Sequence, residues 1–292
     1  MKTGAILIAG PTASGKSALA IKLARENNGV IVNADSMQIY RDLNILTARP
    51  DKDDLGAVPH QLYGTVPASQ RYSVGGWIKD VAQVLDSLDR DDIRPIIVGG
   101  TGLYFKALTE GLAAVPDIPK DVLEVWRARQ NSEESESLHA ILSERDADMA
   151  ARLKPGDGQR IVRALSVLDA TGRSLLEWQK EPPEPALISL ETCDSRILMP
   201  ERSKLYSRID ARLDQMVAAG AIEEVEGLMA QNLDPSLPAM KALGVPHFIA
   251  MLKGNVKREE AVRRAQVDTR HYAKRQMTWF RQQMPGWQVH QI

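Results

Sequence analysis

The chain lacks several features that mark common classes of protein. Its 292 residues include one cysteine, Cys193, which excludes an internal disulfide and a metal cluster built from thiolates. No apolar run approaches the roughly 20 residues that a membrane-spanning helix needs, and the first run, at residues 5–9, is too short for the core of a signal peptide. Repeats and low-complexity tracts are also missing. We therefore expect a cytoplasmic protein that has no membrane partner.

A strong overall charge is missing too, because the formal net charge is −1. This argues against a protein that coats nucleic acid with its whole surface. Positive charge is nevertheless concentrated in residues 253–281, which hold nine lysines and arginines but three acids. At about 100° per residue, Arg263, Arg270, Lys274 and Arg281 share one side of a helix, and apolar and aromatic residues share the other. Such a face is either a solvated helix surface or a binding surface for nucleic-acid phosphates, and we favour the second because no acid interrupts the row.

The most informative segment that is present is Gly10–Ser17, which matches the pattern GxxxxGK[ST] in full. An apolar run precedes it and helix-forming residues follow, which is the context of a phosphate-binding loop rather than of a plain glycine-rich turn. In such a loop, backbone N–H groups converge on a phosphate at the start of a helix. Lys16 adds a positive charge, and the Ser17 hydroxyl is placed to bind Mg²⁺. We therefore expect a ligand that carries a di- or triphosphate, with Mg²⁺ as cofactor.

Short apolar runs at 5–9, 30–32 and 95–98 alternate with helical patterns, and a run at 196–199 resembles a returning strand. This order predicts an α/β protein with a doubly wound parallel sheet, like the core of P-loop NTPases. Ligands of such sheets bind beyond the carboxyl ends of the strands. We therefore expect the segments after the first three runs to form one site.

A change in composition predicts the domain organisation. Residues 1–115 read as the first part of the core, and residues 116–195 as a charged, helical insertion. Residues 196–292 complete the core and then continue with helices that include the basic one. No coiled-coil seam or exposed apolar stripe calls for a partner copy, so we expect a monomer.

Two parts of familiar P-loop proteins are absent from the sequence. The guanine-binding string NKxD does not occur, and the run at 95–98 ends in Gly99–Gly100 where ATPases place an acid. Asp35 and Thr101, each near a strand end, instead suggest a transferase site in which a base and a hydroxyl flank a bound diphosphate. A kinase acting on a nucleoside or small metabolite remains the alternative, and a non-catalytic RNA-binding module is a third hypothesis.

These motifs resemble those of bacterial tRNA dimethylallyltransferases, also called isopentenyl-tRNA transferases, over nearly the whole chain. The matching segments are Gly10–Ser17, Asp35–Tyr40, Thr47–Pro50, Pro59–His60, Val98–Tyr104, Gln159–Arg163 and Tyr272–Trp279. The resemblance implies transfer of a dimethylallyl group from dimethylallyl diphosphate to N6 of the adenosine at tRNA position 37, next to the anticodon on its 3′ side. The tRNAs implied are those that read codons beginning with U. The loop would then hold the diphosphate of the donor rather than ATP.

The resemblance and the residue chemistry together name the expected site residues. The catalytic residues expected are Asp35, Thr101, Lys16 and Arg208. The diphosphate would be held by Gly10, Pro11, Thr12, Ala13, Ser14, Gly15, Lys16 and Ser17, with Arg212, and the metal by Ser17. The tRNA, through its anticodon stem-loop, would contact Asp35, Ser36, Met37, Gln38, Thr101, Gln159, Arg160, Ile161, Val162, Arg163, Arg270, Lys274 and Arg281.

Chemistry suggests a role for each catalytic residue. Asp35 would accept the proton of N6, although an aspartate here could instead cap a helix or hold Mg²⁺ through water. Thr101 would hydrogen-bond the bridging oxygen of the donor. Arg208 and Arg212 lie one helical turn apart; the resemblance implies that either could clamp the diphosphate, and we favour Arg208. Gln38 carries the donor and acceptor that suit an adenine edge.

The chain departs from the family pattern at two positions. Gly158 stands where the family usually has proline, and Val245 stands where it often has tyrosine. We expect Gly158 to loosen a turn beside the RNA contact, whereas Val245 leaves open whether the family's local packing or contact role is kept at this position. Neither departure touches the proposed chemistry.

Overall fold

The computed structural model describes residues 4–291, and the chain divides into two compact units. One unit contains the segments up to Thr109 and from Ala186 onward, and the other is Glu110–Pro185. Residues 1–3 and 292 of the expected core lie outside the described part. The helical unit thus ends before the expected limit of residue 195, because Ile188 is fully buried in the core of the first unit and the backbone N–H of Leu187 donates to the carbonyl of Leu108.

Helices and strands alternate through the first unit. Its elements are β1 (Ile6–Ala9), α1 (Lys16–Glu26), β2 (Gly29–Asn33), α2 (Lys52–Ala57), β3 (His60–Gln61), α3 (Val74–Arg90), β4 (Arg94–Gly99), α4 (Gly102–Glu110), the 3₁₀ turn Leu190–Thr192, β5 (Asp194–Met199), α10 (Arg202–Ala218), α11 (Ala221–Ala230), the 3₁₀ turn Ala239–Lys241, α12 (Val245–Leu252), α13 (Arg258–Gln283) and β6 (Gln288–Gln291). The helical unit contains α5 (Lys120–Ser132), α6 (Ser135–Arg145), α7 (Ala147–Ala150), α8 (Gly158–Thr171) and α9 (Leu175–Trp178).

The six strands form one parallel sheet in the order β3-β2-β4-β1-β5-β6, which confirms the predicted α/β class. The four apolar runs are strands β1, β2, β4 and β5 as predicted. The sequence did not predict β3 or β6, which occupy the two edges of the sheet. Edge strands have fewer apolar neighbours, and Gln288–Gln291 is largely polar and exposed, so no apolar run marks it.

The two faces of the sheet bury different helices because strand side chains alternate between faces. Ile6 and Ile8 of β1 pack with Leu23 of α1 on one face. On the other face, Leu7 belongs to a cluster with buried residues of α3, α4, α10 and α13, among them Phe280. The sheet is therefore covered on both sides, as a parallel sheet requires.

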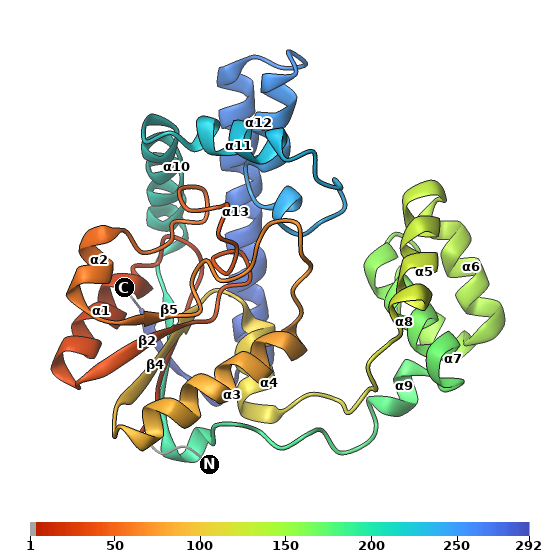
Figure 1. Cartoon of the computed structure of the whole chain (residues 1–292), viewed down its shortest axis with the longest axis horizontal. Coiled ribbons are helices and arrows are strands. Elements are labelled where there is room, and N and C mark those ends of the chain that lie inside the picture. The colour runs from red at the N-terminus through yellow and green to blue at the C-terminus, as the bar shows by residue number, and fades with distance from the viewer. Residues whose placement is uncertain (1–3, 292) are drawn as a thin grey trace. The chain divides into compact units, whose positions relative to one another are not determined.

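A second apolar core lies among the C-terminal helices. Phe248 of α12, Val225 of α11 and Ala261 of α13 are fully buried there with Leu43, which belongs to the loop after β2. In Figure 1, the long helix α13 extends from the α11–α12 region to the sheet. One helix thus contacts both cores.

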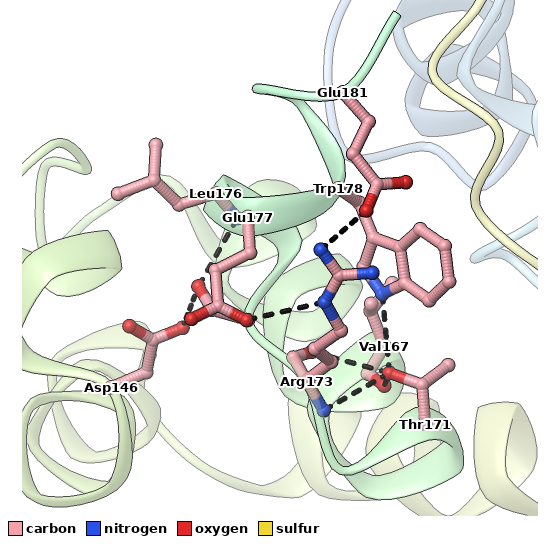
Figure 2. Close-up of polar contacts among 9 residues, drawn as sticks. Asp146, Val167, Thr171, Arg173, Leu176, Glu177, Trp178 and Glu181 are labelled. Carbon is pink, nitrogen blue, oxygen red and sulfur yellow. Dashed lines mark hydrogen bonds and ion pairs between the residues drawn. The ribbon is translucent and has the colours of Figure 1, made fainter.

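The helical unit has its own core and its own polar network. Trp126, Leu142 and Leu165 are buried in it. Figure 2 shows how the α8–α9 turn is held: the Arg173 guanidinium lies 4.4 Å from the centre of the Trp178 ring and donates to the carboxylates of Glu177 and Glu181. These contacts link the end of α8 to α9 and to the segment that follows it.

The two departures from the family pattern have local structural explanations. Gly158 is the first residue of α8, where a Cβ would lie 2.7 Å from Oγ of Ser135. Val245 is the first residue of α12 and is fully buried in the second core. The glycine therefore allows close helix packing within the helical unit, and the valine packs inside the second core.

Among the described residues, no helix combines the length and the apolar composition that crossing a membrane would require.

Candidate active site

Three loops meet at the carboxyl edge of the sheet because β2, β4 and β1 are neighbours there. They are the loop Gly10–Gly15 after β1, residues 34–38 after β2, and Gly99–Thr101 at the end of β4. A Cβ on Gly99 would lie 2.0 Å from the carbonyl oxygen of Ala34, so only glycine permits the close approach of the second and third loops. The predicted convergence of these segments is present in the structure.

The first loop has the shape of an anion cradle. Gly15 adopts φ 83°, a left-handed conformation that costs glycine little, and α1 begins at the next residue. Nζ of Lys16 donates to the carbonyl of Pro11 at 3.2 Å, which holds the side chain over the loop. Oγ of Ser14 is buried and has no hydrogen-bond partner among the described residues. The loop therefore presents unused donors and a positive charge at the start of a helix, which suits a phosphate group.

Charges of both signs surround Lys16. Burial lowers its pKa to about 8, the negative charge of Asp35 acts to raise it, and the positive charge of Arg212 lowers it further. Burial also lowers the pKa of Arg212, again opposed by Asp35. Two cations and one carboxylate therefore share a poorly solvated site that an added anion would stabilise.

Asp35 is held by a framework that sequence reasoning missed. Asn33, the last residue of β2, is fully buried; its Nδ2 donates to the carbonyls of Asp35 and Leu62, and its Oδ1 accepts from the N–H of Asp35. Oδ1 of Asp35 accepts from the N–H of Met37 at 2.9 Å. Its Oδ2 has no hydrogen bond among the described residues and lies near Gly100, 3.4 Å from the position of a Cβ there. Asp35 thus caps a turn with one oxygen and keeps the other for a ligand.

The charge of Asp35 acts on three tyrosine side chains. Burial and the charge of Asp35 both raise the pKa values of Tyr63, Tyr104 and Tyr272. The three phenols therefore stay neutral at physiological pH.

Thr101 joins the second and third loops. Its Oγ1 accepts from the N–H of Ser36 at 2.9 Å and lies 3.2 Å from Oγ of Ser36, while its own N–H donates to the carbonyl of Ala34. Because Oγ1 accepts from a backbone group, its hydrogen can be donated to Ser36 or to a ligand. The predicted proximity of Thr101 and Asp35 is present.

The structure separates the two arginines of α10. Arg212 is half-buried and lines a cavity of about 190 Å³ together with Ser17 and Gln38. Arg208, one turn earlier, is exposed and does not line that cavity. The structure therefore places Arg212, and not the Arg208 that we favoured, beside the Ser17 side of the phosphate loop. Asp35 and Thr101 lie outside the lining of the cavity, which therefore borders the phosphate loop from the Ser17 side.

Gln38 has fewer free groups than we expected for a residue that reads a base. Its Nε2 donates to the carbonyls of Thr47 and Ala48, at 2.8 and 3.0 Å. Both amide hydrogens are therefore used to hold the loop that follows β2. Only the amide oxygen remains for an adenine edge.

The residues expected to contact tRNA include some whose side chains cannot. Ile161 and Val162 of α8 are buried in the core of the helical unit, whereas Gln159, Arg160 and Arg163 are exposed. Ile161 and Val162 are buried because the helical period places these two positions on the side of α8 that faces the core of the helical unit.

On α13, the predicted apolar side is confirmed. On the basic side, some cations already form ion pairs within the protein. Arg263 and Arg264 both bind Glu260, and Arg270 binds Asp210 of α10. Lys274 and Arg281 are exposed.

The residues present fit Mg²⁺ bound together with a diphosphate. In the described part of the chain, no group of three or more His, Cys, Asp or Glu side chains could hold a metal by itself. The Ser17 hydroxyl is exposed at the start of α1, and Asp51 and Asp54 line the same cavity. Mg²⁺ commonly takes one or two protein ligands and completes its shell with phosphate oxygens and water.

Comparisons with known proteins show which family the chain resembles. A family model described as IPP transferase matches residues 38–283, and one described as isopentenyl transferase matches residues 3–63. A tRNA dimethylallyltransferase of Bradyrhizobium sp. (strain ORS 278) is 55% identical over 96% of this chain and 91% of its own length. One from Chelativorans sp. (strain BNC1) is 53% identical over 99% of both chains.

Solved structures show the same likeness. The tRNA isopentenylpyrophosphate transferase of Bacillus halodurans superposes with a TM-score of 0.70 at 32% identity, over 100% of this chain and 90% of that one. A eukaryotic dimethylallyltransferase acting on tRNA gives a TM-score of 0.83 at 26% identity, over 99% of this chain and 74% of that one. With a phosphate loop, a carboxylate and a threonine at one sheet edge, and with this similarity over its length, the chain belongs to the tRNA dimethylallyltransferase family.

Proposed function

We propose that this enzyme transfers the dimethylallyl group of dimethylallyl diphosphate to N6 of the adenosine at tRNA position 37 and releases diphosphate. We expect its substrates to be tRNAs that read codons beginning with U. The observation that carries the proposal is the sharing of one poorly solvated site by Lys16, Arg212 and Asp35. The two cations suit a departing diphosphate, and the carboxylate suits a proton acceptor beside it.

The reaction forms one C–N bond as one C–O bond breaks. The electron pair of the C–O bond leaves with the diphosphate, whose charge Lys16, Arg212 and the N–H groups of the phosphate loop stabilise. The N6 amine is a poor nucleophile because its lone pair is delocalised into the ring. Oδ2 of Asp35 accepts its proton as the new bond forms. The hydroxyl of Thr101 donates to the bridging oxygen.

The Ser17 hydroxyl and the donor's phosphate oxygens would hold Mg²⁺, which would add charge neutralisation to the diphosphate. We further infer that the anticodon stem-loop binds with its adenosine turned out of the stack, since a stacked base cannot reach Asp35. Ser36, Met37 and Gln38 lie next to Asp35 in the chain and would contact that base. We expect a monomer that works in the cytoplasm.

The deciding experiment is mass spectrometry of nucleosides from unmodified tRNA incubated with the protein and dimethylallyl diphosphate. We expect a dimethylallyl mass gain on adenosine. A parallel incubation with ATP tests the kinase alternative. Phosphate transfer from ATP to a small acceptor, with no gain on tRNA, would overturn the proposal.

The pKa of Lys16 predicts the alkaline side of the pH profile. The free enzyme holds Lys16 at a pKa of about 8, and a bound diphosphate favours the charged form and raises this pKa. Donor binding therefore takes up a proton, and kcat/KM for dimethylallyl diphosphate should be constant below about pH 8 and fall above it. A Lys16→Arg variant, whose charge persists, should lack this fall whatever its absolute rate. An identical alkaline limb in both proteins would rule out Lys16 as its cause.

Salt dependence should identify the cations of α13 that contact RNA. Lys274 is exposed, so Lys274→Ala should weaken tRNA binding and reduce the slope of log K against log salt by about one. Arg263 is the matched control because Glu260 already pairs with it. Arg263→Ala should therefore change the slope less. Equal slopes for wild type and Lys274→Ala would make this face a solvated surface.

A further inference from the structure

Gln276 of α13 joins two of the three loops of the site. It is a polar side chain with 6% of its surface exposed. Its Oε1 accepts from the N–H of Thr12 in the phosphate loop at 3.0 Å, and its Nε2 donates to the carbonyl of Gly100 at 2.8 Å. A buried amide without partners is costly, and here one loop supplies a donor to its oxygen and another supplies an acceptor to its nitrogen.

The space around Gln276 shows how closely this amide fits. A Cβ on Gly100 would lie 2.4 Å from Nε2 of Gln276, with Oδ2 of Asp35 3.4 Å away and the carbonyl oxygen of Gly10 3.5 Å away. The amide therefore lies where the phosphate loop, the Gly100 turn and the carboxylate approach one another. Gly100 has no side chain, and this leaves room for the amide.

Neighbouring positions on α13 contact the same region. A Cβ on Gly102 would lie 2.1 Å from the ring of Trp279, so the ring packs directly on the backbone at the start of α4, the residue after the third loop. Tyr272, one turn before Gln276, is near enough to Asp35 for that charge to raise its pKa. Residues 272, 276 and 279 share one side of the helix, so this side of α13 faces the phosphate loop and the segment Gly100–Gly102.

We propose that Gln276 is a positioning residue for the transfer reaction. It holds the phosphate loop and the Gly99–Thr101 turn in fixed register, so that a diphosphate in the loop lies within reach of the Thr101 hydroxyl and beside Asp35. The role rests on the proposed function. The role requires a carboxamide, because one loop presents an N–H and the other a carbonyl. The amide oxygen accepts from the first and the amide nitrogen donates to the second, and both atoms lie at the end of the same side chain.

Glutamate at position 276 tests the hydrogen-bonding role, because its effect on kcat should depend on pH, whereas a change in packing alone should not. An ionised Gln276→Glu side chain can accept from the Thr12 N–H but cannot donate to Gly100, and it places a charge near Asp35. We expect kcat to fall between about tenfold and a hundredfold at pH 7.5, with tRNA affinity unchanged. Protonation restores a donor, so the ratio of variant to wild-type kcat should rise as the pH is lowered. Gln282→Glu, at an exposed position of the same helix, is the matched control and should give a ratio that does not vary with pH.

Two further measurements separate this inference from the proposed function and from a folding defect. Gln276→Met preserves shape and removes both hydrogen bonds, and its fold can be checked by circular dichroism and thermal unfolding. Hydrogen exchange of the Thr12 amide in this variant should be at least about tenfold faster than in wild type, a result that needs no catalysis. Unchanged exchange at Thr12, or a kcat ratio for Gln276→Glu that is independent of pH, would overturn the positioning role. A wild-type protein that transfers no dimethylallyl group would overturn the proposed function alone.

Discussion

Replacing Asp35 by alanine is expected to lower kcat by about a hundredfold or more and to leave tRNA affinity almost unchanged. The reason is that the two carboxylate oxygens of Asp35 have different surroundings. Oδ1 accepts from the N–H of Met37, whereas Oδ2 has no hydrogen bond among the described residues and lies near Gly100. The free oxygen is the one that can accept the N6 proton. Single-turnover rates with saturating substrates, and tRNA binding measured separately, check the expectation.

Asparagine at position 35 separates the base from the turn cap. Asp35→Asn keeps an oxygen that can accept from Met37, so the turn is preserved, but the amide cannot take a proton from N6. We expect Asp35→Asn to lose nearly as much activity as Asp35→Ala. Wild-type turnover in Asp35→Asn would show that the residue only caps the turn. Equal losses of turnover and tRNA affinity would assign it to binding.

Replacing Arg212 should lower activity by a similar factor, and we expect the loss in kcat/KM for dimethylallyl diphosphate. Arg212 is half-buried beside the phosphate loop, and Asp35 acts on its pKa. Arg212→Ala should lower kcat/KM for dimethylallyl diphosphate by about 10²–10³, because a preorganised cation beside a leaving diphosphate is lost from a poorly solvated site. Steady-state kinetics with the donor varied at saturating tRNA provide the measurement.

Arg208 is the natural control for this experiment because it is on the same helix and has the same chemistry. Its side chain is exposed, so Arg208→Ala should leave kcat/KM for the donor within about twofold of wild type. A loss at Arg208 that matches the loss at Arg212 would mean that α10 presents both arginines to the bound donor. A loss at Arg208 alone would restore our preference from the sequence.

Much of the site was predictable because its signals are local. The phosphate loop needs glycines, a lysine and a serine at fixed spacing between a strand and a helix, and all of these are neighbours in the sequence. Asp35 and Thr101 were predictable because each follows a buried apolar run, and parallel strands bring such ends to one edge. The edge strand β6 gave no such signal, since its four residues are polar or exposed.

Other features depend on which side of a helix faces a neighbour. Helical spacing cannot distinguish Arg208 from Arg212, because both lie on α10 one turn apart and their burial depends on how α10 packs on the core. The row of cations on α13 was visible in the sequence, but the ion pair between Arg270 and Asp210 joins residues 60 positions apart.

By itself, then, the sequence determined the α/β class, the phosphate loop, the strand ends that carry Asp35 and Thr101, and the family. These follow from short-range patterns, in which strand, turn and helix are read from adjacent residues. Only the tertiary structure decided that Arg212 rather than Arg208 lines the cavity beside Ser17, that Asn33 holds Asp35, and that Gln276 joins Thr12 to Gly100. The contact between Gln276 and Thr12 spans 264 positions. Contacts of this kind arise from the packing of elements far apart in the chain, which local patterns do not encode.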